Sequence, residues 1–258
     1  MDKTVLETIV ARHQAGSPFV VAALVRVRGS APQRPGARLV VSPDGNTVGT
    51  IGGGCLEMEA RRRALNLMGE RRAERFELRL DDDFGWDDGL LCGGEATVLL
   101  DGDTARQSAM ATDALRLLHD TIAGRGVRTH TNGDTVGTID WVHVDPSRSD
   151  VIWDKESGTL TEPILPEPVL VVCGCGHVGA ALVRLGAMLG FRTVAVDDRP
   201  EYANAIRLPE AAVVVCEDPA RVAREWPTDG RTYWVVVTRG HRNDGRVLAG
   251  IVDRPSAY

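Results

Sequence analysis

The most informative segment of the chain is residues 169–179, which read Val169-Leu170-Val171-Val172-Cys173-Gly174-Cys175-Gly176-His177-Val178-Gly179. The five apolar residues predict a buried strand, and the glycines that follow have G-x-G-x-x-G spacing and open a helix that we expect to end near Leu189. A second apolar run, 193–196, ends at Asp197. A strand, a glycine turn, a helix, a second strand and an acid in this order predict a Rossmann-type turn.

This turn has the chemistry of a dinucleotide site. The glycines Gly174, Gly176 and Gly179 allow helix N–H groups to approach a diphosphate, and the helix dipole favours its negative charge. Asp197 would accept hydrogen bonds from a ribose diol and repel a 2′-phosphate, although the nearby Arg199 could accommodate one. The alternative is that the glycines only pack a helix on a strand and bind nothing.

The rest of the second half continues the pattern. Strands and helices alternate from residue 169 to the end, which predicts a parallel sheet built from four strand–helix pairs. The fourth expected strand, 233–237, runs into a polar turn that contains Arg239, His241 and Asp244. In a doubly wound sheet the first and fourth strands are neighbours at the switch point, so we expect this turn and His177 to face one crevice.

The first half has a different organisation. We expect helices at 4–15, 55–68 and 104–123, strands at 19–27, 75–80 and 96–100, and a hairpin formed by 37–42 and 47–51. Residues 125–167 read as a β-rich tail with strands at 135–144 and 151–153 and a proline-bearing linker. The predicted domains are therefore 1–125, the tail and linker 126–167, and 168–258. The predicted class is α/β, with a mixed α+β N-terminal domain before a Rossmann-like doubly wound parallel sheet.

Two Cys–Gly elements stand out in the first domain. Gly52, Gly53 and Gly54 precede Cys55 at an expected helix start, where a thiol is accessible and its pKa is lowered. Cys92 and Gly93 form a second element that enters a strand. Both cysteines are candidate functional thiols; the alternative is that they are small core residues beside turn glycines.

Composition excludes several classes of protein. Apolar residues make up 43% of the chain and charged residues 26%, as expected of a packed globular protein, and 28 of 258 residues are glycine. The net charge is 30 − 36 = −6, which gives no electrostatic basis for binding duplex DNA or an anionic membrane. The five cysteines show neither disulfide nor zinc spacing, and the acidic residues at 81–88 match no calcium loop, so no metal site is expected. With no apparent signal peptide or membrane span, we expect a cytoplasmic protein.

Taken together, the motifs resemble the XdhC/CoxI family, the accessory proteins of xanthine dehydrogenase and related molybdenum hydroxylases. The resemblance covers residues 18–258 and rests on segments that occur in the family's order: 29–37, 49–57, 92–94, 174–179, 197–199 and 238–241. Members usually continue past the position of Tyr258 into a further strand, so the second domain is expected to be truncated or completed by a partner.

The resemblance implies a chaperone with no catalytic residues of its own. Such proteins bind the molybdenum cofactor (molybdopterin), support its sulfuration with a cysteine desulfurase and insert it into the apo-hydroxylase. A homodimer is possible. The resemblance assigns cofactor binding to these residues: Gly52, Gly53, Gly54, Cys55, Cys92, Gly93, Gly174, Gly176, His177, Gly179, Asp197, Arg199, Arg239 and His241. We expect the cargo to lie between the two domains.

Two other functions stay open on the sequence alone. The glycine turn and Asp197 would also suit an NAD(P)-dependent oxidoreductase that binds NAD(H) or another dinucleotide, with His177 or His241 transferring a proton. A non-enzymatic nucleotide-binding interaction module is the second alternative. Neither explains the 29–57 segment.

Overall fold

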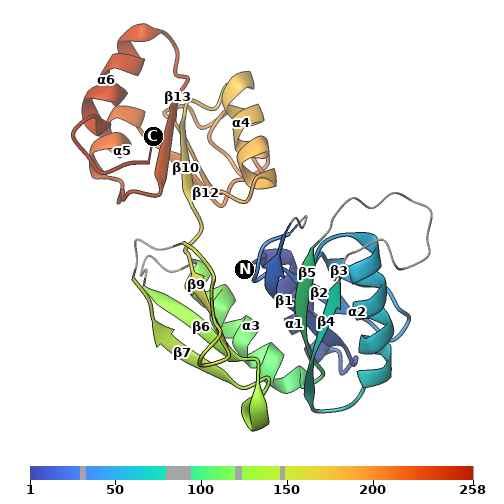
Figure 1. The fold of residues 1–258 in the computed structure, drawn as a ribbon. Coiled ribbons are helices and arrows are strands. Elements are labelled where there is room, and N and C mark those ends of the chain that lie inside the picture. Colours follow the sequence, from blue (N-terminus) through green and yellow to red (C-terminus); the bar gives the residue numbers. More distant parts are fainter. Residues whose placement is uncertain (30–32, 80–93, 120–123, 146–148, 258) are drawn as a thin grey trace. The chain divides into compact units, whose positions relative to one another are not determined.

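In the computed structural model the chain divides into two compact units, Met1–Pro166 and Glu167–Tyr258 (Figure 1). The structure describes residues 1–29, 33–79, 94–119, 124–145 and 149–257. No helix within these ranges combines the length and the apolar character needed to cross a bilayer.

The first unit is built on an antiparallel five-stranded sheet with the order β3-β2-β1-β5-β4. Its strands are β1 (Val20–Arg28), β2 (Arg38–Val41), β3 (Thr47–Gly49), β4 (Ala73–Arg79) and β5 (Glu95–Asp101). The expected hairpin is the β2–β3 pair, in which Val41 lies opposite Thr47.

Helices cover both faces of this sheet, which explains the continuous apolar run in β1. Helix α2 (Gly54–Leu67) packs on the face that carries Val20 and Leu24. Helices α1 (Lys3–Gln14) and α3 (Thr104–His119) pack on the opposite face with Val21. Because side chains alternate between faces, a strand buried on both sides is apolar at every position.

The segment expected to be a tail and linker is a second antiparallel sheet, with the order β7-β6-β9-β8. Its strands are β6 (Arg125–His130), β7 (Ile139–His143), β8 (Ile152–Asp154) and β9 (Thr159–Ile164). Two of the strands, β6 and β9, were not predicted, and the strand expected at 135–144 begins only at Ile139, because a short 3₁₀ helix ends at Thr135. Pro163 was expected to belong to the linker. This prediction was wrong, because Pro163 lies in β9 and pairs with Gly126 of β6.

The second unit is a four-stranded parallel sheet with the order β12-β11-β10-β13. Its elements are β10 (Val169–Cys173), α4 (His177–Met188), β11 (Arg192–Asp197), β12 (Val213–Cys216), α5 (Pro219–Glu225), β13 (Thr232–Val236) and α6 (His241–Ile251). Strands β10 and β13 are neighbours, with Cys173 opposite Val236, as the switch-point argument predicts.

Helices lie on both faces of the parallel sheet. Helix α4 packs through Val183 on the face of Val172 and Ala195, whereas α5 and α6 pack through Ala223 and Val247 on the other face. The predicted α/β class with a Rossmann-like doubly wound sheet is thereby confirmed. One crossover differs, because turns that begin at Pro200 replace the expected helix between β11 and β12.

Candidate functional site

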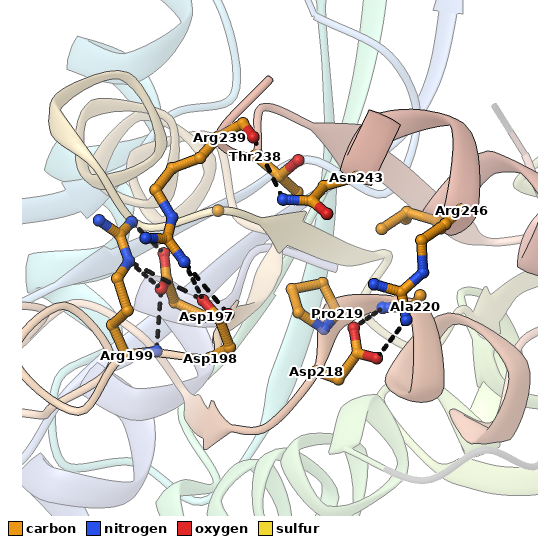
Figure 2. Close-up of a pocket in the computed structure, with 12 residues that line it drawn as sticks. Asp197, Asp198, Arg199, Asp218, Pro219, Ala220, Thr238, Arg239, Asn243 and Arg246 are labelled. Carbon is orange, nitrogen blue, oxygen red and sulfur yellow. Dashed lines mark hydrogen bonds and ion pairs between the residues drawn. The ribbon is translucent and has the colours of Figure 1, made fainter. Parts of the chain in front are cut away.

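A cavity of about 250 Å³ lies at the carboxyl edge of the parallel sheet, where nucleotides bind in doubly wound folds. The turns after all four strands contribute to it, together with the first turns of α5 and α6 (Figure 2). It is lined by Gly174, Asp197, Asp198, Arg199, Asp218, Pro219, Ala220, Thr238, Arg239, Asn243, Arg246 and Val247.

The three fingerprint glycines have different structural roles. Gly174 has a φ of +105°, and a Cβ there would lie 2.4 Å from the Val237 carbonyl oxygen. A Cβ on Gly179 would lie 1.8 Å from the carbonyl oxygen of Gly174. Packing therefore requires glycine at both positions. At Gly176, φ is −64° and a Cβ would meet no atom within 4 Å, so neither the backbone nor the packing explains this glycine.

Helix capping distinguishes the helices that follow glycine turns from the others. The N-terminus of α5 is capped by Asp218, which accepts from the Ala220 N–H at 3.0 Å. Helix α4 begins after Gly176 and α2 after Gly53, and neither receives a side-chain cap. Their first-turn N–H groups therefore point toward solvent or a ligand, and such groups attract anions.

Asp197 forms a buried clasp with the fingerprint turn. Its carboxylate accepts from the Cys175 N–H at 2.8 Å, the Arg199 N–H at 3.1 Å, and the guanidinium of Arg199 at 2.9 and 3.0 Å. Burial alone would raise the pKa of Asp197, but the hydrogen bonds from Arg199 and Cys175 outweigh it and the pKa is lowered. Asp197 is thus an ionised carboxylate that joins β11 to the turn after β10.

Two further ion pairs line the cavity from opposite walls (Figure 2). Arg239, in the turn after β13, contacts both carboxylate oxygens of Asp198 at 3.2 Å. Arg246, on α6, lies 2.8 Å from Asp218. All four side chains are 41–60% exposed, so these pairs contribute little stability and can exchange partners.

The predicted histidines are on the surface. His177 is the first residue of α4 and His241 the first of α6, both are exposed, and neither lines the cavity. The turn after β13 is held by Asp244, whose carboxylate accepts from the Thr238 N–H at 3.0 Å and its hydroxyl at 2.6 Å. Of the residues expected to meet here, the cavity unites Gly174, Asp197, Arg199 and Arg239.

In the first unit the glycine turn leads directly into α2. Glu57 holds this turn, because its carboxylate accepts from the Thr50 hydroxyl at 2.5 Å and the Ile51 N–H at 3.2 Å. Cys55 is half-buried in the first turn of the helix, and a Cβ on Gly54 would meet nothing within 4 Å. Cys92 and Gly93 lie outside the described residues, as does the acidic segment at 81–88.

Comparison with known families identifies the chain. Residues 12–79 match the family model described as the XdhC and CoxI family, and residues 170–258 match that of the XdhC Rossmann domain. The chain belongs to the XdhC and CoxI family.

Individual relatives agree with this assignment. A probable xanthine dehydrogenase subunit from Bacillus subtilis is 24% identical over 89% of this chain and 74% of its own length. The molybdenum cofactor insertion chaperone PaoD of Escherichia coli is 37% identical over 38% of this chain and 30% of its own. A crystal structure described as a xanthine dehydrogenase from Bacillus halodurans shares the fold, with a TM-score of 0.82 and 22% identity, over all of this chain and 81% of that one. The chain thus spans about three quarters of the first relative and under a third of PaoD.

The sequence assigned no binding role to three charged residues of this cavity, Asp198, Asp218 and Arg246, although Asp198 lies in the 197–199 segment that carries the family resemblance. A signal was present for Asp218, because an Asp-Pro pair shortly after an apolar strand is typical of a helix start at the carboxyl edge of a parallel sheet. Arg246 had no such signal, since an arginine on an exposed helix face is ordinarily a solvated residue.

Proposed function

We propose that this XdhC/CoxI protein is an accessory chaperone that binds the molybdenum cofactor as cargo. In this proposal it supports sulfuration of the cofactor with a cysteine desulfurase and inserts the cofactor into xanthine dehydrogenase or a related molybdenum hydroxylase. Family membership and the similarity to the insertion chaperone PaoD support the general role. The cargo's molybdenum performs its redox chemistry only in the client enzyme, so this chain's task is to bind, orient and release.

The observation that carries the proposal is the free space at Gly176. The cofactor ends in a phosphate, or in a diphosphate when it carries a nucleotide, and such a group needs N–H donors and room for its oxygens. The uncapped first turn of α4 offers the donors, and the absent side chain at Gly176 leaves the room. The residues present therefore fit the tail of the cargo.

The pterin head of the cargo needs polar contacts and a thiol near its sulfur atoms. We assign these contacts to Gly52, Gly53, Gly54 and Cys55, and to the second element at Cys92 and Gly93. Support comes from α2, whose N-terminus has no side-chain cap and whose first turn contains the half-buried Cys55. In this assignment Cys55 is a functional thiol.

The proposal is tested by reconstitution of an apo-hydroxylase from purified components. Addition of this protein, loaded with cofactor in the presence of a cysteine desulfurase, should restore activity that free cofactor restores poorly. Cys55→Ser should lose most of this effect, whereas Cys216→Ser, which alters an exposed thiol outside the glycine turns, should keep it. Full restoration by Cys55→Ser would remove the assigned thiol, and no restoration by the wild type would overturn the proposal. Bound nicotinamide in the purified protein would instead favour an oxidoreductase.

A further inference from the structure

We propose that the cavity at the carboxyl edge of the second unit binds a nucleoside diphosphate with a free 2′,3′-diol. In this proposal Asp198 accepts hydrogen bonds from the diol, and Arg239 binds the diphosphate. This inference rests on the proposed binding of a nucleotide-bearing cofactor by the Rossmann unit. The inference assigns the ribose diol to Asp198 and not to Asp197, the acid that the sequence indicated. The cavity volume of about 250 Å³ lies just below the roughly 300–1,000 Å³ of complete small-molecule sites, which suits one part of a larger cofactor.

Asp197 has no capacity left for a ligand. A carboxylate offers about four acceptor sites, and four donors occupy them in the structure: the N–H groups of Cys175 and Arg199 and two guanidinium nitrogens of Arg199. The side chain is also only 3% exposed. A ribose could reach it only if the clasp opened, and that would release the fingerprint turn from β11.

Arg199 is committed to the same clasp. Its guanidinium carbon lies 3.7 Å from the centre of the Tyr202 ring, and its charge is neutralised by the bidentate contact with Asp197. An arginine held in this way is a poor partner for a 2′-phosphate. We therefore do not expect Arg199 to accommodate a 2′-phosphate, the alternative that the sequence left open.

Asp198 and Arg239 have the opposite character. Their side chains are 51% and 57% exposed, they line the cavity, and they meet through one guanidinium nitrogen of Arg239. A diphosphate is a stronger partner for Arg239 than an exposed carboxylate, because it offers more oxygens and more charge. Exchange of Arg239 onto the diphosphate leaves Asp198 with only the longer contact to Arg199 at 3.8 Å, so its oxygens can accept from the two ribose hydroxyls.

The same arrangement selects against two kinds of nucleotide. A 2′-deoxyribose leaves one Asp198 oxygen without its donor, and a 2′-phosphate places like charges together. The Arg246–Asp218 pair bounds the cavity on the far wall, and its exposure makes it an exchangeable contact for the base or a phosphate. A cytosine and an adenine nucleotide both enter the test, because they carry the same ribose diol and diphosphate.

The test is calorimetric titration of the full chain with CDP, ADP, 2′-deoxy-CDP and adenosine 2′,5′-diphosphate. We expect the wild type to bind CDP or ADP, and to bind 2′-deoxy-CDP about 10–100-fold more weakly than CDP. Asp198→Ala should remove this ribose preference, and Asp198→Asn should improve binding of the 2′-phosphate. Arg239→Gln should weaken every nucleotide about tenfold and keep the ribose preference.

Glu210→Gln is the matched control, because Glu210 forms an exposed pair with Arg184 at 3.4 Å and does not line the cavity. It should bind all four probes like the wild type. Absence of nucleotide binding, equal binding of CDP and 2′-deoxy-CDP by the wild type, or an unchanged preference in both Asp198 variants would overturn the inference. Cofactor transfer to an apo-hydroxylase that persists in such a case would leave the proposed function standing, since transfer is measured independently of the nucleotide titration.

Discussion

At the scale of single residues, Asp197 shows how one carboxylate can fix a binding turn without touching a ligand. Its two oxygens hold the Cys175 N–H and the Arg199 side chain within 2.8–3.0 Å, and the side chain is buried. We expect Asp197→Asn to destabilise the second unit by about 2–3 kcal/mol, somewhat less than the loss of a fully buried ion-pair partner, since Arg199 remains 20% exposed. Chemical denaturation followed by tryptophan fluorescence, to which Trp226 and Trp234 of the second unit contribute, measures this, and a change below about 0.5 kcal/mol would refute the clasp.

The same residue sets an acid limit on stability. Because the pKa of Asp197 is lower in the folded chain than its ordinary value of about 3.9, its contribution is complete above that value and is lost as the pH falls through the folded pKa. The wild type should therefore lose stability below about pH 4 more steeply than Asp197→Asn. Parallel slopes for the two proteins would show that Asp197 makes no such contribution.

The fingerprint glycines give a second prediction at this scale. Gly179→Ala forces a Cβ to within 1.8 Å of a backbone oxygen, so we expect a loss of about 2–3 kcal/mol. Gly176→Ala meets open space and should change stability by less than about 1 kcal/mol. Thermal unfolding of the two variants compares them directly, and equal losses would mean that Gly176 is also a packing glycine.

The thiols differ in reactivity for a physical reason. Burial raises the pKa of both Cys173 and Cys175 to about 12, so at pH 8 almost no thiolate forms at either. Iodoacetamide at pH 8 should therefore modify Cys55 and the exposed Cys216 first, as mass spectrometry of peptides would show. Cys92 should follow Cys55 if it is a functional thiol. A rate for Cys92 no faster than that of Cys173 would assign it to packing.

At the scale of elements, a buried ion pair joins the two sheets of the first unit. Arg38 of β2 and Glu162 of β9 form a bidentate contact at 2.5 and 2.6 Å, with side chains 6% and 3% exposed. Arg38→Met removes the guanidinium partner of the buried Glu162 carboxylate and should cost about 3–5 kcal/mol, whereas the double variant Arg38→Met/Glu162→Leu should recover most of this. The exposed Arg72 is the control, and its change to Met should cost under about 1 kcal/mol. Equal effects of Arg38→Met and Arg72→Met in urea denaturation would show that the buried pair has no special role.

The sequence predicts a strand well where its own apolar residues mark it. It predicts a strand poorly where pairing with neighbouring strands, and not the residues themselves, stabilises the extended backbone. Strands β1 and β10 are evident because long apolar runs mark them. Strand β6 is not, since its two arginines and Gly126 obscure the alternation, and Pro163 makes β9 look like a linker. At the site, the glycine turn and Asp197 are correctly placed by pattern, but which acid is free for a ligand depends on the orientation of Arg199, which no spacing rule encodes.

At the scale of the whole molecule, one accessory protein combines a parallel sheet that has an open glycine turn with an antiparallel unit that bears a thiol. The central claim is that the second unit binds the phosphate end of the molybdenum cofactor at Gly176. Gly176→Val tests this claim against Gly230→Val, a matched control at a glycine that also has open space and no positive φ but lies in the turn before β13, outside the glycine turn that opens α4.

The most direct measurement is equilibrium binding of purified molybdenum cofactor to the full chain, with bound pterin quantified by fluorescence after oxidation. The wild type and Gly230→Val should bind equally, and Gly176→Val should bind at least about tenfold more weakly while unfolding at the wild-type temperature, because its side chain fills the space that the phosphate requires. Wild-type affinity in Gly176→Val would contradict the central claim and leave the fingerprint turn a packing feature.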